Sequence, residues 1–315
     1  MTTSTLHERI EGGLIGLLVG DALGVPYEFH PPDQIPPLDA IEFVPPAGFR
    51  RAHAGVPPGT WSDDGALALA LLASLLDQGR FDADDFGRRL VAWYERGVLA
   101  VDGHVFDVGI QTAQAIRALM GGAPAEAAGS RDERANGNGS LMRVLPLVLW
   151  HRGGDAELVA DAHAQSRVTH GHLRSQICCA LYCLWARRVL DDAPDPWAAS
   201  VAALRAIYGA GSPEQAELEF HIRPAGPPEG RGSGYVVDCL HSARLALAAD
   251  GYEQVVKAAI ALGHDTDTTA CVAGGIAGLR DGVRAIPERW RAQLRGQELL
   301  APLRDRLLER DKTTR

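Results

Sequence analysis

Two short acidic clusters, far apart along the chain, constrain the fold more than any other feature of this sequence. Residues 62–64 (Ser-Asp-Asp) and 265–268 (Asp-Thr-Asp-Thr) each stand where an apolar, helix-like stretch begins. If folding brings them together, their four carboxylates repel one another strongly unless cations compensate. Hard divalent ions such as Mg²⁺ and Mn²⁺ prefer the oxygen ligands that these residues offer. The clusters therefore predict a two-metal site and place both ends of the chain in one domain.

Helix capping is the alternative interpretation of each cluster taken alone. Ser62 is a good N-cap, and acidic residues in a first helical turn complement the helix dipole. Asp265 or Thr266 could cap the second helix in the same way. However, Asp265 and Asp267 are two positions apart and would diverge on a regular helix. Their spacing favours a turn that leads into the helix, with the side chains converging.

Helical periodicity covers most of the chain and predicts an all-α fold, a compact multi-helix bundle. A capping box at Thr5 and Glu8 opens the first helix. Ala270, Gly274 and Gly278 recur every four residues and predict a helix face that another helix can approach closely. The one short extended piece is expected at 41–44. Further helices are expected at 66–76, 83–96, 109–119, 141–150, 156–168, 173–190, 197–208, 235–248, 252–262, 266–279, 287–294 and 298–310.

Two stretches interrupt the helical pattern. Residues 30–58 hold many of the prolines and are expected to wrap the surface or the mouth of a cleft. Residues 211–234 have the composition of a flexible loop. Either stretch resembles an interdomain linker, and the length alone would allow two domains. A site shared by the two acidic clusters instead predicts a single domain over 1–315.

Composition excludes several classes of function. The 315 residues are 46% apolar, enough for a sizeable core, and the net charge of −9 offers no basic surface for general nucleic-acid binding. The longest Ala/Leu-rich run, residues 65–76, is too short to cross a membrane, and the N-terminus lacks a secretory signal pattern. We therefore expect a soluble cytoplasmic protein, with a monomer as the default state. The cysteines show no CxxC pair and are expected to be reduced and buried: Cys178, Cys179, Cys183, Cys239 and Cys271.

Five motifs in a fixed order make the sequence more specific. They are GLIGLLVGDALGVPYEF, GTWSDDGALAL, GNGSLMRVLPL, SGYVVDCLHSA and LGHDTDTTACVAGGIAGLRDGVRAIPERW. Together they resemble the ADP-ribosylglycohydrolase family, which includes dinitrogenase reductase-activating glycohydrolase and the ADP-ribosyl-acceptor hydrolases. Order and spacing hold over residues 12–290.

The resemblance implies a compact all-helical domain with two Mg²⁺ or Mn²⁺ ions at the base of a cleft. Serine replaces the threonine that usually begins the first cluster, which keeps the ligand oxygen. Gly65 replaces a second threonine often found after the two aspartates. The ligands implied are Ser62, Asp63, Asp64, Asp265, Asp267 and Thr268.

The resemblance also implies two candidate catalytic carboxylates. In relatives that cleave serine-linked ADP-ribose, a glutamate at the position of Glu28 lies beside the metals. In some relatives that act on arginine linkages, the proposed acid or base is an aspartate at the position of Asp107. Both residues are present in this chain. The acceptor therefore stays open among arginine, serine, a nucleic-acid base, O-acetyl-ADP-ribose and other glycosides.

The glycine-rich stretch at residues 137–140 provides three of the candidate substrate-binding residues. Glycines ahead of a helix expose N–H groups that can hold an anion, although a simple helix start explains them too. The resemblance places the diphosphate and distal ribose at this stretch and leaves Arg143 either structural or a ligand. A Thr-His pair lines the cleft in relatives, whereas metal binding by neighbouring histidines is disfavoured. The substrate-binding candidates are Asn138, Gly139, Ser140, His170 and, at the adenosine end, Tyr235.

The implied activity is metal-dependent hydrolysis of an N- or O-glycosidic bond between ADP-ribose and an acceptor, either a protein side chain or a small molecule. Two alternatives come from other classes. A non-catalytic ADP-ribose-binding or structural member would not need both acidic clusters intact. A two-metal nucleotide phosphoesterase is disfavoured because histidine is nearly absent from the candidate ligands.

Overall fold

The fold is built from α-helices, as the periodicity predicts. This computed structural model describes residues 4–313, and that range contains fourteen α-helices and no β-strand. The helices are α1 (Leu6–Gly24), α2 (Asp63–Gln78), α3 (Ala83–Arg96), α4 (Ile110–Met120), α5 (Leu145–Trp150), α6 (Asp155–Arg167), α7 (Leu173–Leu190), α8 (Pro196–Tyr208), α9 (Pro213–Glu217), α10 (Val236–Ala246), α11 (Tyr252–Ile260), α12 (Thr266–Asp281), α13 (Glu288–Gln293) and α14 (Gln297–Thr313).

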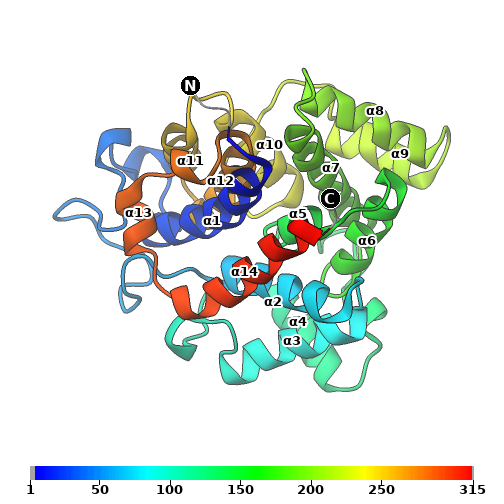
Figure 1. Ribbon diagram of the computed structural model, residues 1–315, viewed down its shortest axis with the longest axis horizontal. Helices are drawn as coiled ribbons and strands as arrows, with labels where there is room; N and C mark the ends of the chain where they lie inside the picture. Colours follow the sequence, from blue (N-terminus) through cyan, green and yellow to red (C-terminus); the bar gives the residue numbers. More distant parts are fainter. Residues whose placement is uncertain (1–3, 314–315) are drawn as a thin grey trace.

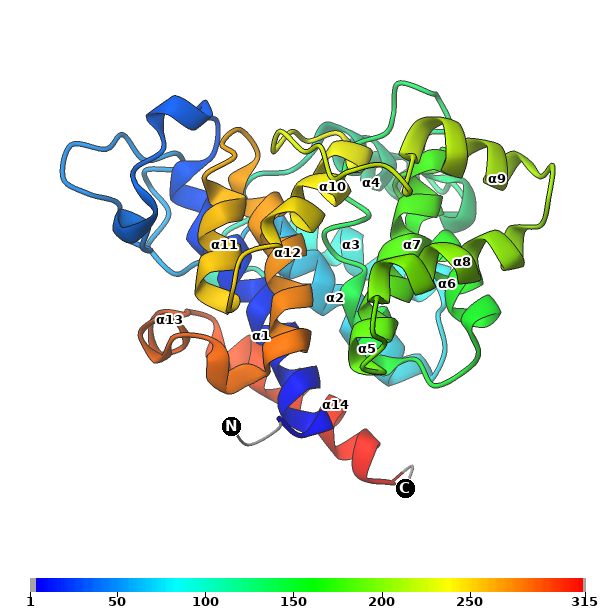
Figure 2. The same cartoon turned by 90° about the horizontal axis from the view of Figure 1, so that it is seen from above.

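Two helices from opposite ends of the sequence, α1 and α12, lie side by side in the centre (Figures 1 and 2). They can do so because small residues meet along the contact. A Cβ atom added at Gly16 would lie 2.5 Å from the carbonyl oxygen of Gly274. The small-residue face predicted on α12 is thus confirmed, and its partner is a matching face on α1. The facing pairs are Gly12 with Gly278, Gly16 with Gly274, Gly20 with Ala270, and Gly24 with Asp267.

Helix α1 is apolar because it is a core helix. The predicted capping box is present: the Glu8 N–H donates to the Thr5 hydroxyl, and the Thr5 N–H donates to the Glu8 carboxylate. Residues from Gly12 to Gly24 are buried without interruption. Within the described residues, the segment Leu6–Tyr27 alone is long and apolar enough to cross a membrane, and 94% of its most apolar window is buried inside the protein. Packing against neighbouring helices accounts for that apolar character.

Helix α2 also follows the sequence prediction. The Ser62 hydroxyl accepts a hydrogen bond from the Asp64 N–H and caps the helix, which ends at Gly79 in a left-handed conformation. Residues 63–75 are all buried, as expected for a helix with apolar residues on nearly every side. The five cysteines are buried and free, as predicted.

The expected helix at 141–150 starts later than predicted, because residues 138–144 form tight turns. The Leu141 N–H donates to the Asn138 carbonyl over 2.8 Å, and α5 begins only at Leu145. Arg143 lies fully buried in this region, where its guanidinium donates to Gln165 and stacks on the ring of Phe86. These contacts hold Arg143 inside the protein core.

Two further expectations are wrong. Residues 41–44 form bends rather than an extended strand. Residues 211–234 are not simply a loop, because they contain α9 and a π-helical turn, Leu218–Ile222. The Ser212 hydroxyl caps α9 by accepting from the Gln215 N–H, and Pro213 occupies the first helical position. The many glycines and prolines around this segment obscured a short, ordinary helix start.

The proline-rich segment 30–58 lies at the outside of the molecule, as expected, and forms the blue loops at one edge in Figures 1 and 2. The Tyr27 hydroxyl anchors it by donating to the Glu42 carbonyl over 2.7 Å. The Ala52 N–H donates to the Pro26 carbonyl over 3.0 Å. These bonds bring residues 52 and 53 back to the end of α1.

Candidate active site

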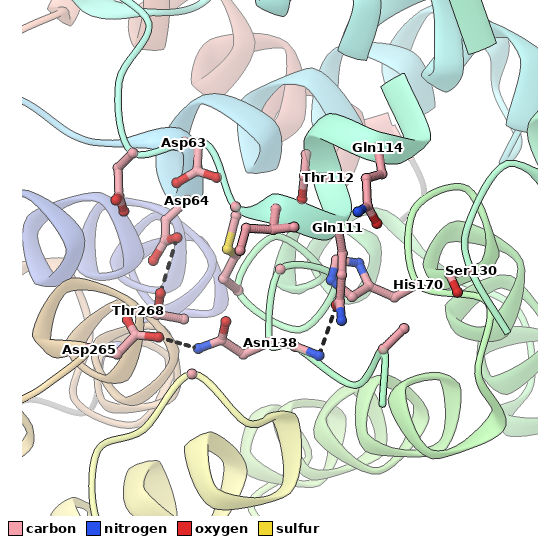
Figure 3. Close-up of a pocket in the computed structure, with 18 of the residues that line it drawn as sticks. Asp63, Asp64, Gln111, Thr112, Gln114, Ser130, Asn138, His170, Asp265 and Thr268 are labelled. Atoms are coloured by element: carbon pink, nitrogen blue, oxygen red, sulfur yellow. Dashed lines mark hydrogen bonds between the residues drawn. The ribbon is translucent and has the colours of Figure 1, made fainter. Parts of the chain in front are cut away.

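The N-termini of α2 and α12 open onto one cavity of about 640 Å³, called here the first cavity. Figure 3 shows Asp63 and Asp64 near Asp265 and Thr268, so the two predicted clusters meet at one wall. The turn at Asn138 borders these acids, and the start of α4 and the segment before α7 complete the lining. Residues far apart in the sequence thus converge on a single hollow.

Helix α1 holds both acidic clusters in place. The buried carboxylate of Asp21 accepts hydrogen bonds from the Ser62 N–H (3.0 Å) and the Gly65 N–H (2.8 Å), which fixes the start of α2. The Thr266 hydroxyl donates to the Gly24 carbonyl over 2.8 Å, which fixes the start of α12. Sequence alone predicts no role for Asp21, since an acid at the end of an apolar helix gives no signal of its backbone partners.

The acidic residues leave ligand atoms unused. Thr268 donates its hydroxyl to Asp64 Oδ1 (3.4 Å) and its N–H to Asp267 Oδ1 (2.9 Å). Asn138 Nδ2 donates to Asp265 Oδ2 over 2.8 Å. The second oxygens of Asp64 and Asp267 are buried and have no hydrogen-bond partner. Buried polar atoms are normally satisfied, so these two oxygens are free to hold a cation.

The electrostatics of the cluster lead to the same interpretation. Burial raises the pKa values of Asp63, Asp64 and Asp267 well above the ordinary range, and the neighbouring acids raise them further. Glu28, Asp265 and Asp267 each offer a carboxylate oxygen, and these atoms lie within 4.8 Å of one another. Protons or cations must neutralise such a group. An all-oxygen set suits a hard divalent ion.

The two candidate catalytic carboxylates share a histidine. His53 Nε2 lies 2.6 Å from Glu28 Oε2 and 3.7 Å from Asp107 Oδ1. Burial and the charge of Asp107 raise the pKa of Glu28 to about 10. Burial and the charge of Asp265 raise the pKa of Asp107 to about 6. His53 was not predicted as a site residue, because a single histidine within a proline-rich loop carries no periodicity or spacing that marks it.

The turn at residues 137–139, which lines the first cavity, is held by its backbone N–H groups. The Asn138 N–H donates to the Gly234 carbonyl (3.0 Å), and the Gly137 N–H donates to Gln111 Oε1 (2.9 Å). These two N–H groups are therefore used in hydrogen bonds that stabilise the turn. A Cβ atom at Gly139 would lie 2.9 Å from the ring of His170, so only glycine lets the turn sit against this side chain.

His170 lines the cavity although it is almost fully buried. Its Nδ1 lies 2.8 Å from the Thr169 hydroxyl. Burial and the charge of Arg143 lower the pKa of His170 to about 3, so the ring is neutral at physiological pH. It can act there as a hydrogen-bonding group but not as a cation.

Two predicted substrate-binding residues lie outside the cavity lining. Ser140 is fully buried, and its hydroxyl lies 2.9 Å from that of Ser166. Tyr235 is 40% exposed, and its hydroxyl accepts from Arg174 over 3.3 Å. Its neighbour Gly234 does line the cavity. Of the predicted metal ligands, Asp63, Asp64, Asp265 and Thr268 line the cavity, and Ser62 and Asp267 are not among the lining residues.

Several lining residues were not predicted. Gln111, Thr112 and Gln114 project into the cavity from the first turns of α4 (Figure 3). Ser130 lines its far end. Polar residues at the start of an amphipathic helix look like an ordinary solvated face, so the sequence alone could not single them out.

Comparison with known proteins supplies the family. The family model described as ADP-ribosylglycohydrolase matches residues 2–315. The chain is 31% identical to the ADP-ribosylarginine hydrolase Tri1 of Pseudomonas putida (strain GB-1), over 98% of this chain and 80% of that protein. It is 29% identical to the ADP-ribosyl-[dinitrogen reductase] glycohydrolase of Rhodospirillum rubrum, over 93% of this chain and 92% of the relative.

A more distant relative is the ADP-ribosylhydrolase ARH3 of Bos taurus, 24% identical over 92% of this chain and 89% of the relative. Among solved structures, one described as an ADP-ribosylglycohydrolase-related protein complex superimposes with a TM-score of 0.76. It is 32% identical, and the match covers 96% of this chain and 98% of the other. The chain belongs to the ADP-ribosylglycohydrolase family of enzymes.

Proposed function

We propose that this protein removes ADP-ribose from modified arginine side chains by metal-dependent hydrolysis of the N-glycosidic bond. The observation that carries the proposal is the first cavity itself, a hollow of about 640 Å³ lined by buried carboxylates that include Asp64, which has an oxygen without a hydrogen-bond partner. Arginine is the favoured acceptor because the relatives Tri1 and the dinitrogen reductase glycohydrolase span nearly the whole chain, and Tri1 is named for that linkage.

In this proposal two Mg²⁺ or Mn²⁺ ions are held by Ser62, Asp63, Asp64, Asp265, Asp267 and Thr268. Such ions polarise substrate oxygens and lower the pKa of water toward neutrality. The partnerless oxygens of Asp64 and Asp267 support this ligand set. Ser62 would have to share its hydroxyl oxygen between an ion and the Asp64 N–H that it already caps.

The catalytic roles follow from the two carboxylates that share His53. Glu28 Oε2 lies 2.6 Å and Asp107 Oδ1 lies 3.7 Å from His53 Nε2. In this proposal Glu28 would give a proton to the leaving nitrogen of the acceptor as the glycosidic bond breaks, and Asp107 would accept a proton from the attacking water. The anionic floor would favour the positive charge that develops on the ribose in an oxocarbenium-like transition state.

The remaining residues would bind and orient ADP-ribose. Asn138, Gly139 and His170 line the first cavity and would take the diphosphate side of the molecule. Tyr235 lies beside the lining residue Gly234 and would contact the substrate at the rim of the cavity. Ser140 would not contact the substrate and would stabilise the turn through its hydrogen bond with Ser166. A cytoplasmic location suits an enzyme with five free thiols that acts on modified proteins.

Product analysis tests this proposal. The purified chain is given arginine-linked and serine-linked ADP-ribosyl peptides and O-acetyl-ADP-ribose, each with Mg²⁺, with Mn²⁺ and with EDTA. We expect free ADP-ribose from the arginine-linked peptide only when metal is present. Release of AMP would instead indicate a phosphoesterase, and binding without any product would indicate a non-catalytic role.

A further inference from the structure

A second cavity, of about 720 Å³, lies next to the first. The two share Glu28, Gly234 and Asp265 and otherwise have different walls. The acidic residues of the site therefore stand between two hollows rather than at the bottom of one. The wall that belongs to the second cavity alone contains Phe29, Arg231, Ser233 and His264.

Phe29 is the unusual member of this wall. Its side chain is 69% exposed, and its backbone has a φ of +65°, a left-handed conformation that bulky residues rarely adopt. The conformation is held because the Phe29 N–H donates to the His264 carbonyl over 2.7 Å. The His264 N–H in turn donates to the His30 carbonyl over 2.6 Å. A strained residue that its surroundings hold in place is typical of a functional site.

The ring of Phe29 is also fixed relative to the catalytic carboxylates. Its centroid lies 5.5 Å from that of His53, the residue bonded to Glu28. Phe29 directly follows Glu28, so one short segment presents an acid to both cavities and an aromatic face to the second. Solvent exposure is unfavourable for an apolar ring, and a ligand that covers it would remove that exposure.

We propose that the second cavity receives the acceptor half of the substrate and that Phe29 stacks on the guanidinium of the modified arginine. This inference rests on the proposed function. The glycosidic bond must lie beside the shared acids, so with ADP-ribose in the first cavity the acceptor extends into the other. An aromatic face attracts a planar cation, and Glu28 and Asp265 add negative charge at the shared edge. Arg231, which is exposed, belongs to the wall beyond that edge.

Three variants test the inference. Phe29→Ala removes the stacking face, Phe29→Tyr restores an aromatic ring, and Phe220→Ala is a matched control because Phe220 is 73% exposed and lines neither cavity. For the arginine-linked peptide we expect Phe29→Ala to raise KM roughly three- to thirty-fold, the range of a cation–aromatic contact. Phe29→Tyr should return KM to within about twofold of the original value, and Phe220→Ala should not change it.

Binding of free ADP-ribose reports on the first cavity alone. Its affinity, measured by calorimetry, should be unchanged in Phe29→Ala. Binding of agmatine, a guanidinium compound with no ADP-ribose, is followed by NMR on the ADP-ribose-loaded protein and should weaken in the same variant. An unchanged KM, or an equal loss of ADP-ribose affinity, would overturn the role of Phe29. A parent protein that binds agmatine through Phe29 but releases no ADP-ribose from the peptide would refute the proposed function and keep the guanidinium site.

Discussion

Replacing Gly16 by alanine tests whether the two ends of the chain meet as closely as the structure shows. The new Cβ would lie 2.5 Å from the Gly274 carbonyl oxygen and 2.9 Å from Cε2 of Tyr252. Carbon and oxygen atoms normally approach to about 3.3–3.6 Å, so α1 and α12 must separate by roughly 1 Å. The atom in the way belongs to the backbone, and no rotamer change can move it aside.

The magnitude follows from two opposing effects. Overpacking a core typically costs about 1–3 kcal/mol. Alanine is a better helix former than glycine by about 0.5–1 kcal/mol, which offsets part of that cost. The hydroxyl of Tyr252 also donates to the Gly16 carbonyl over 2.7 Å, and this bond would be strained as the helices part. We expect a net loss of about 1–2 kcal/mol in the free energy of unfolding.

Urea denaturation followed by circular dichroism measures this loss. Gly87→Ala is the matched control, because Gly87 is also inside a helix, α3. Its added Cβ would meet only side-chain atoms, Ala125 Cβ at 3.3 Å and Leu119 Cδ2 at 3.4 Å. That variant should be neutral or more stable by up to about 1 kcal/mol. If Gly16→Ala proved as stable as Gly87→Ala, the close packing of α1 on α12 would be refuted.

Three further predictions concern the proposed metal site. Asp267→Asn should abolish metal-dependent turnover while the circular dichroism spectrum stays helical; full activity would exclude Asp267 as a ligand. EDTA should inactivate the enzyme and Mg²⁺ or Mn²⁺ should restore it and raise Tm, since ions that bind only the folded state stabilise it; a Tm independent of metal would contradict a folded two-ion site. Burial raises the pKa values of Asp107 to about 6 and Asp21 to about 7, so their contribution to metal-free stability is complete below about pH 4 and is lost as the pH rises through those values. The Tm gain on adding Mg²⁺ should therefore be larger at about pH 8 than at about pH 5. Burial also lowers the pKa values of His170 to about 3 and of His163 to about 4. At a given pH these two histidines change the Tm equally with and without Mg²⁺, so they do not affect the Tm gain.

Much of the fold could be predicted because it depends on local rules. The caps at Thr5 and Ser62 are short-range signals, and each acts as its sequence pattern predicts. The exceptions have local causes as well. The start of α5 shifts because residues 138–144 are tied into turns, and α9 was hidden by the composition around it.

The site was predictable in outline and not in detail. Acidic residues at two helix starts gave its charge and its candidate ions, and the family resemblance added Glu28, Asp107 and the turn at Asn138. No pattern in the sequence marked the partners that position these groups. His53 reaches Glu28 from a proline-rich loop, and Asp21 holds α2 through backbone N–H groups of residues remote in sequence.

The sequence by itself therefore determined the helices, the small-residue face on α12 and the acidic clusters, because each depends on the identity and spacing of neighbouring residues. Only the tertiary structure decided that α1 is the helix packed on that face and that Glu28 stands between two cavities. It also left Asp64 and Asp267 with partnerless buried oxygens. These features depend on contacts between residues far apart in the chain, for which local chemistry provides no signal.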